Sequence, residues 1–104
     1  MSSKAVFVSM PMGGRSGYDI ETEFLRVHDH LYSVLDEHFT ILDSYFTEEP
    51  DDSVQNAGVW YLGASILKLA YADIAYFVKG WRDAKGCRLE HQIAEQYGIT
   101  IIEE

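Results

Sequence analysis

The segment DIAYFV, residues 73–78, constrains the fold of this chain more than any other, because five apolar residues follow one acidic residue without a break. Such a continuous run is typical of a strand that is buried on both faces of a parallel sheet. Residues 4–9 form a second run of β-branched and aromatic side chains, which ends before Pro11. Parallel strands require crossover segments that cover the sheet, so the chain is predicted to be an α/β protein.

Amphipathic helices are predicted between these strands. Apolar residues recur every three or four positions from Asp19 to about His38, with Asp19 as the expected N-cap. A second helix is expected over residues 59–72, although Gly63 weakens the pattern. A third helix is expected over residues 87–98 and closes on Gly98. The remaining predicted elements are short strands over residues 40–46 and 99–102 and a polar loop over residues 47–58.

Together these elements predict one domain over residues 1–104, a small three-layer Rossmann-like or flavodoxin-like sandwich with a parallel sheet of four to five strands. Ligands of such sheets bind beyond the carboxyl ends of the strands, where the strand order reverses. Two loops meet that condition, residues 10–18 and residues 79–87. We therefore expect the binding site between these two loops.

Charge and composition narrow the classes of partner and the compartment. A net charge of −9 argues against non-specific binding to nucleic acid or to an anionic membrane. There is no apolar run long enough for a membrane span and no secretory signal, so we expect a cytoplasmic protein. The single cysteine excludes an internal disulfide.

The two loops carry groups that an anion could use. Four of the eight bases lie within ten residues of one another, and either they form a local anion site or they are solvated side chains at a helix start. The first loop, MGGRSG, lacks both the G-x-G-x-x-G fingerprint and the P-loop lysine. Its amides and Arg15 could hold a phosphate at the helix N-terminus, or the glycines could serve a plain turn. The clustered bases are Lys79, Arg82, Lys85 and Arg88.

Two carboxylates and one aromatic stand out as candidates for chemistry. Asp73 opens an apolar strand and either orients a ligand hydroxyl or caps the amides of the following loop. Glu90, four residues after Gly86, is either a nucleophile or base, or a glutamate favoured by the helix dipole. Trp60 offers either a stacking surface or a core side chain. His28 and His30 point to different helix faces, so we predict no metal and no cofactor.

Three segments carry a resemblance to a known family. VFVSMPMGGR, WYLGASI and ADIAYFVKGWRDAKGCRLEHQIAEQYGI resemble the short nucleoside 2-deoxyribosyltransferase-like proteins of the domain of unknown function 4406, which are frequent in phages and prophages. The first loop is also similar to that of 2′-deoxynucleoside 5′-monophosphate N-glycosidases. The resemblance covers most of the chain apart from residues 40–56.

The resemblance implies a reaction and the residues for it. A carboxylate attacks C1′ of a deoxyribose, expels the base and forms a glycosyl-enzyme, and Glu90 matches that nucleophile. Asp73 matches an aspartate that shapes the site, and Ser65 stands nearest to a family aspartate that acts on the leaving base or sugar. The implied binding residues are Ser9, Met10, Gly13, Gly14, Arg15, Trp60, Gly80, Trp81 and Gly86.

The sequence also departs from the family. Active relatives carry a tyrosine in or just after the first strand, where this chain has Val6 and Phe7. They also carry an aspartate where this chain has Ser65, and serine is a poor general acid.

Two functions follow as expectations. One is N-glycosidic cleavage or 2-deoxyribosyl transfer on a nucleoside or nucleotide. The other is an inactive protein that sequesters a nucleotide, in a phage setting as a counter-defence. Relatives often complete their sites across a dimer, which implies a homodimer or a larger homo-oligomer.

Overall fold

The computed structural model describes residues 3–42 and 49–104 and has an α/β architecture. Four strands form one sheet in the order β2-β1-β3-β4, and every neighbouring pair is parallel. The predicted α/β sandwich with a parallel sheet of four to five strands is therefore confirmed. The elements in chain order are β1 Lys4–Ser9, α1 Gly17–Val34, β2 Phe39–Leu42, α2 Ala57–Leu69, β3 Ile74–Phe77, the 3₁₀ helix η1 Trp81–Asp83, α3 Lys85–Gln96 and β4 Thr100–Glu103.

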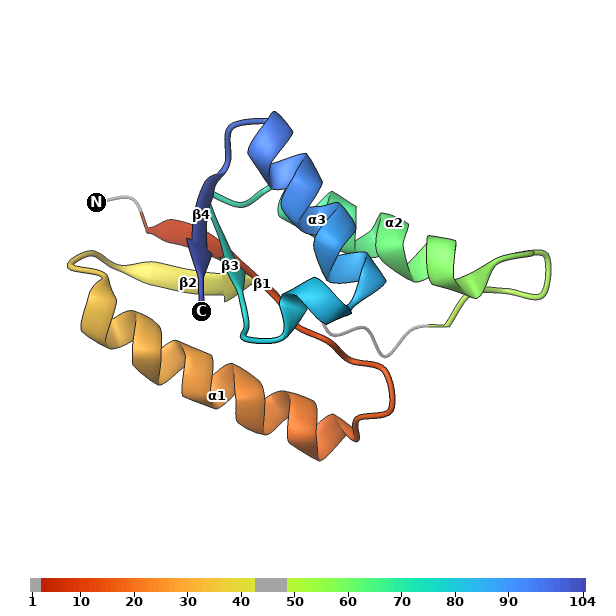
Figure 1. Cartoon of the computed structure of the whole chain (residues 1–104), viewed down its shortest axis with the longest axis horizontal. Coiled ribbons are helices and arrows are strands. Elements are labelled where there is room, and N and C mark those ends of the chain that lie inside the picture. The colour runs from red at the N-terminus through yellow and green to blue at the C-terminus, as the bar shows by residue number, and fades with distance from the viewer. Residues whose placement is uncertain (1–2, 43–48) are drawn as a thin grey trace.

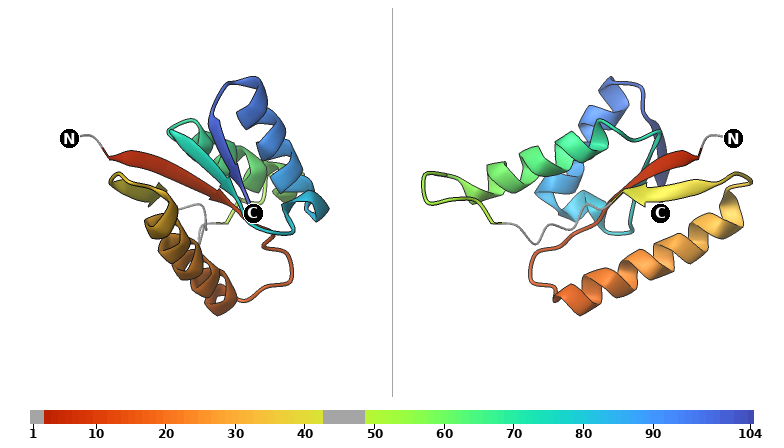
Figure 2. Two further views of the ribbon diagram at one scale, coloured as in Figure 1. Left: turned by 60° about the vertical axis from the view of Figure 1, so that its left-hand side comes forward. Right: turned by 180° about the vertical axis from the view of Figure 1, so that it is seen from behind.

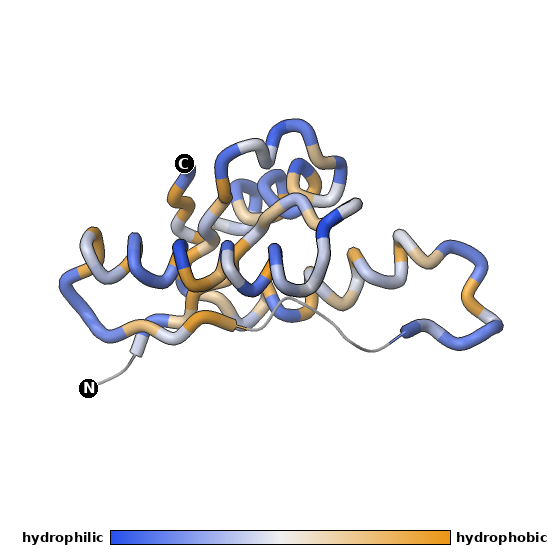
Figure 3. The backbone as a smooth tube through the Cα atoms, turned by 90° about the horizontal axis from the view of Figure 1, so that it is seen from below, coloured by the Kyte–Doolittle hydropathy of each residue, from blue (hydrophilic) through white to orange (hydrophobic). Residues whose placement is uncertain are grey.

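The helices lie in two layers, with α1 on one face of the sheet and α2 and α3 on the other (Figures 1 and 2). Alternation along β1 divides its side chains between these layers. Val6 and Val8 pack with Val27 and Leu31 of α1, whereas Phe7 packs with Leu69 and Ala94 on the opposite face. Hydrophilic and hydrophobic residues alternate along the helices (Figure 3), as expected for helices with one face on the sheet.

Helix α1 begins earlier and ends earlier than predicted. Its N-cap is Ser16, whose hydroxyl accepts the backbone N–H of Asp19 at 3.1 Å, so the expected N-cap at Asp19 is wrong. Asp19 is instead the third helical residue, where its charge favours the positive end of the helix dipole. The helix ends because Leu35 has an extended backbone, and its side chain packs against the α1-facing core.

Strand β1 has its predicted bounds, and the other described boundaries shift by one to three residues. Asn56 caps α2 by accepting the Val59 N–H at 3.0 Å, and the helix continues through Gly63. Gly98 has a φ of 73° and closes α3 as predicted, with the Ile99 N–H donating to the Ala94 carbonyl. Strand β2 begins at Phe39, and residues 43–46 of the predicted strand lie outside the described residues.

Candidate functional site

A cavity of about 210 Å³ lies beyond the carboxyl end of β1. Within the sheet, β2 lies on one side of β1, and β3 and β4 lie on the other side of it. The strand order therefore reverses at β1, and the cavity lies at this switch point. Helices α2 and α3 supply the remaining walls. The lining residues are Phe7, Val8, Ser9, Met10, Met12, Gly58, Tyr61, Leu62, Ser65, Gly86, Cys87 and Glu90. We call this cavity the Glu90 pocket.

Two further cavities, of about 740 and 440 Å³, lie along α1 and β2 and share His28 as a lining residue. Both are larger than the Glu90 pocket, but their walls contain no buried carboxylate among the described residues. Chemistry depends on positioned reactive groups rather than on volume. The Glu90 pocket is therefore the candidate site.

Glu90 is the chemical centre of this pocket. Glu90 is only 7% exposed, and the Ser9 hydroxyl donates a hydrogen bond to its Oε1 at 2.6 Å. Burial raises the pKa of the Glu90 carboxyl, while hydrogen bonds from Ser9 and Ser65 act in the opposite direction. Among the described residues, no lysine or arginine forms an ion pair with Glu90. The carboxylate is thus held by neutral hydroxyl donors.

The local sequence explains how three elements converge on this carboxylate. In α3, Cys87, Glu90 and Ala94 follow a three- and four-residue spacing and form the buried face of the helix. Ser9 is the last residue of β1 and lies two positions after Phe7, so both side chains project to the α2 and α3 side of the sheet. Ser65 comes from α2.

Cys87 lies beside Glu90 in the pocket wall and is 4% exposed. Burial raises the pKa of its thiol, and the charge of Glu90 acts in the same direction. A thiol with a raised pKa stays protonated and is a poor nucleophile. The arrangement therefore favours Glu90 over Cys87 as the reactive group.

The structure brings five of the residues expected from the sequence into this pocket. The carboxylate of Glu90 lies with both predicted serines, and the backbone of Gly86 forms part of the wall. Gly13, Gly14, Trp60, Gly80 and Trp81 do not line it. The five residues that do are Ser9, Met10, Ser65, Gly86 and Glu90.

Asp73 does not join them, and its expected place in the site needs correction. It precedes β3, so it lies at the amino end of the sheet, opposite to the pocket. Its carboxylate accepts the Ala5 N–H at 2.8 Å, and its own N–H donates to the Ala5 carbonyl at 2.8 Å. Asp73 thus caps the start of β1 and joins it to β3.

Arg15 and the clustered bases do not face the pocket either. The Arg15 guanidinium donates to the carbonyls of Pro11 at 3.1 Å and Asp19 at 3.3 Å, on the α1 side of the loop. Arg82 lies over the Trp81 ring and near Glu103, and Arg88 donates to the Arg82 carbonyl at 2.8 Å. None of these bases therefore belongs to the lining of the Glu90 pocket.

Trp81 is a core residue rather than a pocket wall. Its indole is 6% exposed and stacks on His91 with 4.1 Å between ring centroids. Phe77 packs against the same indole at 5.3 Å. Gly80, just before it, has a φ of 94° and supplies the left-handed residue that turns the chain from β3 into η1.

Sequence reasoning missed most of the α2 wall of the pocket. Gly58, Tyr61, Leu62 and Ser65 share one face of this helix through three- and four-residue spacings. Because Ser65 was expected in the site, the four-residue spacing between Tyr61 and Ser65 could have predicted Tyr61 as well. Met12 and Cys87 were also left out of the expected site, as was Phe7, whose ring lines the pocket where active relatives are expected to carry a tyrosine.

Within residues 3–42 and 49–104, histidine, cysteine and acidic side chains nowhere gather in threes as a metal ion would require. None of the helices in the same ranges has the length and apolar character needed to cross a membrane.

Comparison with known protein families places most of the chain in one family model. The family model described as a domain of unknown function, DUF4406, matches residues 4–103, which is nearly the whole chain. No curated protein and no solved structure matches.

Proposed function

This chain belongs to the DUF4406 family, and from that premise we propose that it cleaves the N-glycosidic bond of a nucleoside, or transfers its 2-deoxyribosyl group, with Glu90 as the nucleophile. The observation that carries the proposal is the buried Glu90 carboxylate, which two serine hydroxyls hold in a pocket at the switch point of the sheet. Carboxylates in such settings serve as nucleophiles at sugar carbons.

In the first step a Glu90 oxygen attacks C1′ of the sugar and forms an ester bond. The bond between C1′ and the base nitrogen breaks, and its electron pair leaves with the base, which takes up one proton. In the second step water, or the nitrogen of another base, attacks C1′, releases the carboxylate and gives up one proton, which restores the group that protonated the leaving base. Atoms and charges balance without any cofactor.

The surroundings of Glu90 support this role. Burial keeps water away from the carboxylate and thereby strengthens its attack, since a desolvated anion is more reactive. The hydroxyls of Ser9 and Ser65 favour the ionised form that attack requires and fix the plane of the carboxylate. Position 65 holds a serine, which orients a ligand but does not supply an acidic proton.

The leaving base must obtain its proton from another group. Tyr61 lies in the wall of the Glu90 pocket, on the same face of α2 as Ser65. A phenol both donates a proton and stacks on a base. We assign proton donation to Tyr61, because the Ser9 and Ser65 hydroxyls already engage Glu90.

The pocket's charge favours a nucleoside over a nucleotide. Among the described residues, no lysine or arginine belongs to its lining, and the Glu90 carboxylate repels a phosphate. Arg15, an expected phosphate ligand, has its guanidinium on two backbone carbonyls and near Glu23. The net charge of −9 adds to this repulsion.

The second candidate function is binding without turnover. Phe7 in place of the expected tyrosine and Ser65 in place of the expected aspartate favour it, because both changes remove acidic groups. A protein that binds without turnover would sequester a nucleoside or nucleotide in the Glu90 pocket.

The experiment that separates the two functions incubates the protein with a panel of deoxynucleosides and their 5′-monophosphates. Free base is followed by chromatography, and binding is measured by calorimetry. We expect base release from a nucleoside, and a loss of about a thousandfold in E90Q, since removing a nucleophile costs several orders of magnitude. Binding with no release above the E90Q level would support sequestration. The absence of both would overturn both functions.

A further inference from the structure

The loop of residues 10–16 connects β1 to α1 and carries two residues that line the Glu90 pocket, Met10 and Met12. Gly13 and Gly14 stand in its middle, where nothing lies within 4 Å of the position that a Cβ would occupy. Gly14 has a φ of 75°, which glycine adopts without strain. A segment with so little packing at its centre requires other interactions to hold one conformation.

Arg15 supplies such interactions. Its guanidinium donates to the Pro11 carbonyl at 3.1 Å and lies 3.9 Å from the Met10 sulfur, and its backbone N–H donates to the Met12 carbonyl at 3.2 Å. The loop therefore offers three acceptors to one residue.

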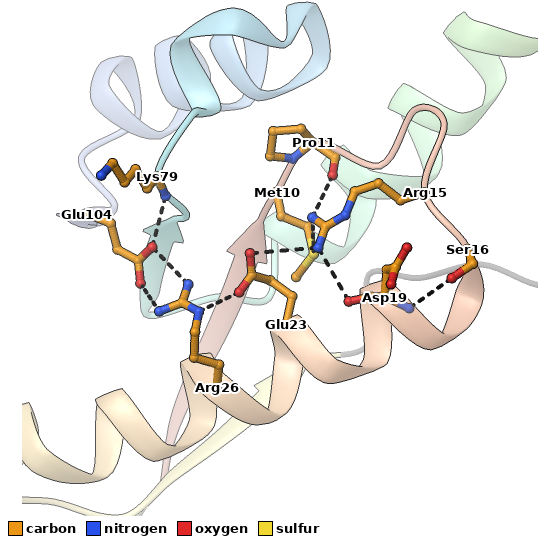
Figure 4. A network of polar contacts seen from close by, with 9 residues as sticks. All are labelled: Met10, Pro11, Arg15, Ser16, Asp19, Glu23, Arg26, Lys79 and Glu104. Carbon is orange, nitrogen blue, oxygen red and sulfur yellow. Dashed lines mark hydrogen bonds and ion pairs between the residues drawn. The ribbon is translucent and has the colours of Figure 1, made fainter.

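The same guanidinium also reaches the helix. It donates to the Asp19 carbonyl in the first turn of α1 at 3.3 Å and lies 3.8 Å from the Glu23 carboxylate. Figure 4 shows Arg15 between the loop and this helix. The planar fork of an arginine allows one side chain to satisfy acceptors on both sides.

We propose that Arg15 is a positioning residue that ties the loop to α1 and thereby holds Met10 and Met12 in the wall of the Glu90 pocket. In this role it touches no ligand. Loss of the guanidinium frees the loop and opens the pocket, while the sheet stays folded. The inference concerns the pocket's shape alone and does not depend on the reaction proposed above.

The chain contains its own reporter of this opening. Cys87 is the only cysteine, lies in the wall of the same pocket and is 4% exposed. The rate at which 5,5′-dithiobis(2-nitrobenzoic acid) modifies this thiol under native conditions therefore measures access to the pocket. We expect the rate to rise roughly tenfold in R15Q, because hydrogen bonds from a charged donor are lost.

Urea denaturation of each variant gives the part of the rate that passes through global unfolding, and this part is subtracted. The matched control is R26Q, which also removes a guanidinium from the Glu23 carboxylate, but Arg26 forms its other ion pair with Glu104 and not with the loop. For R26Q we expect no acceleration beyond its change in global stability. R15K, with the charge but without the fork, should fall between wild type and R15Q.

The positioning role is overturned if R15Q reacts no faster than wild type after the correction, or if R26Q is accelerated by the same factor. If R15Q does not fold, R15K decides, and an R15K rate equal to the wild-type rate overturns the role. Because the assay contains no nucleoside, its outcome is independent of whether the proposed reaction occurs.

Discussion

Glu90 must be ionised to attack a sugar carbon, yet its burial favours the protonated form. The Ser9 hydroxyl, at 2.6 Å from Oε1, lowers the pKa of the carboxyl against this effect. In S9A we therefore expect the pKa of Glu90 to rise further, and the acid limb of base release against pH to move to higher pH. The control S33A removes a hydroxyl on α1 that donates to the His30 carbonyl. An S9A profile that coincides with that of S33A would contradict the role of Ser9.

The raised pKa of Glu90 also predicts a pH-dependent cost to folding. Between the ordinary value of 4.5 and the raised value, the folded state binds more protons than the unfolded state, so stability falls as the pH rises. The variant E90Q removes this effect. We expect its unfolding free energy, relative to wild type, to increase as the pH is raised above 4.5, as measured by urea denaturation. E95Q, from the exposed side of the same helix, is the matched control. If it shows the same gain, the effect does not arise from burial of Glu90.

At the scale of elements, α2 contains a glycine that lowers the stability of the helix and does not line the pocket. Gly63 lies inside the helix, does not line the pocket, and has open space where a Cβ would project. Alanine is favoured over glycine in helix interiors by about 1 kcal/mol. We expect G63A to raise the unfolding free energy by that amount and to leave base release unchanged. The contrasting variant G80A forces a side chain onto a φ of 94° and should lower stability by about 1 kcal/mol. A loss of stability in G63A would contradict this account of α2.

The elements also show how far the sequence predicts the fold and the site. Strands 4–9 and 73–78 were predictable, because apolar runs bounded by loops have one common solution in a parallel sheet. The family resemblance pointed to Glu90 and to Ser9. Tyr61 was missed because α2 is apolar on several faces, so its rotation against the sheet depends on tertiary packing.

Charged side chains in loops were the least predictable part. The sequence gives the position of Arg15 but not the carbonyls that its guanidinium reaches, since these depend on the turn at Gly13 and Gly14. Asp73 illustrates the same limit, because a carboxylate beside a strand end caps whichever amide the neighbouring strand presents.

At the scale of the whole molecule, Glu104 joins α1, β3 and the segment after it. Its carboxylate accepts from Arg26, from the Tyr76 hydroxyl and from the Lys79 N–H (Figure 4 shows the bonds to Arg26 and Lys79). Burial alone would raise the pKa of the Glu104 carboxyl. Hydrogen bonds, chiefly from Arg26 and Lys79, outweigh this effect and lower the pKa to about 2. Its ionised form therefore stabilises the fold above the ordinary value of 4.5, and this contribution is lost as the pH falls toward 2.

We accordingly expect E104Q to be less stable than wild type at neutral pH, with a difference that shrinks as the pH is lowered from 4.5 toward 2. Chemical denaturation across this range measures the difference. If the stability difference between wild type and E104Q stays constant with pH, the variant is destabilised by poorer shape complementarity of the amide and not by loss of the charge. Y76F, which removes a single donor, should reproduce only part of the neutral-pH loss.

The division of β1 between two layers has a consequence for protein engineering. Val6 and Val8 face α1, whereas Phe7 and Ser9 face the Glu90 pocket. A designer can repack Val6 in the α1 layer for thermal robustness and screen substitutions at Phe7 for new substrates, with little interference between the two libraries, provided that Val8, which also lines the pocket, is left unchanged. An insertion or deletion within β1, by contrast, would exchange the two sets of side chains, so the strand tolerates changes of identity but not of length.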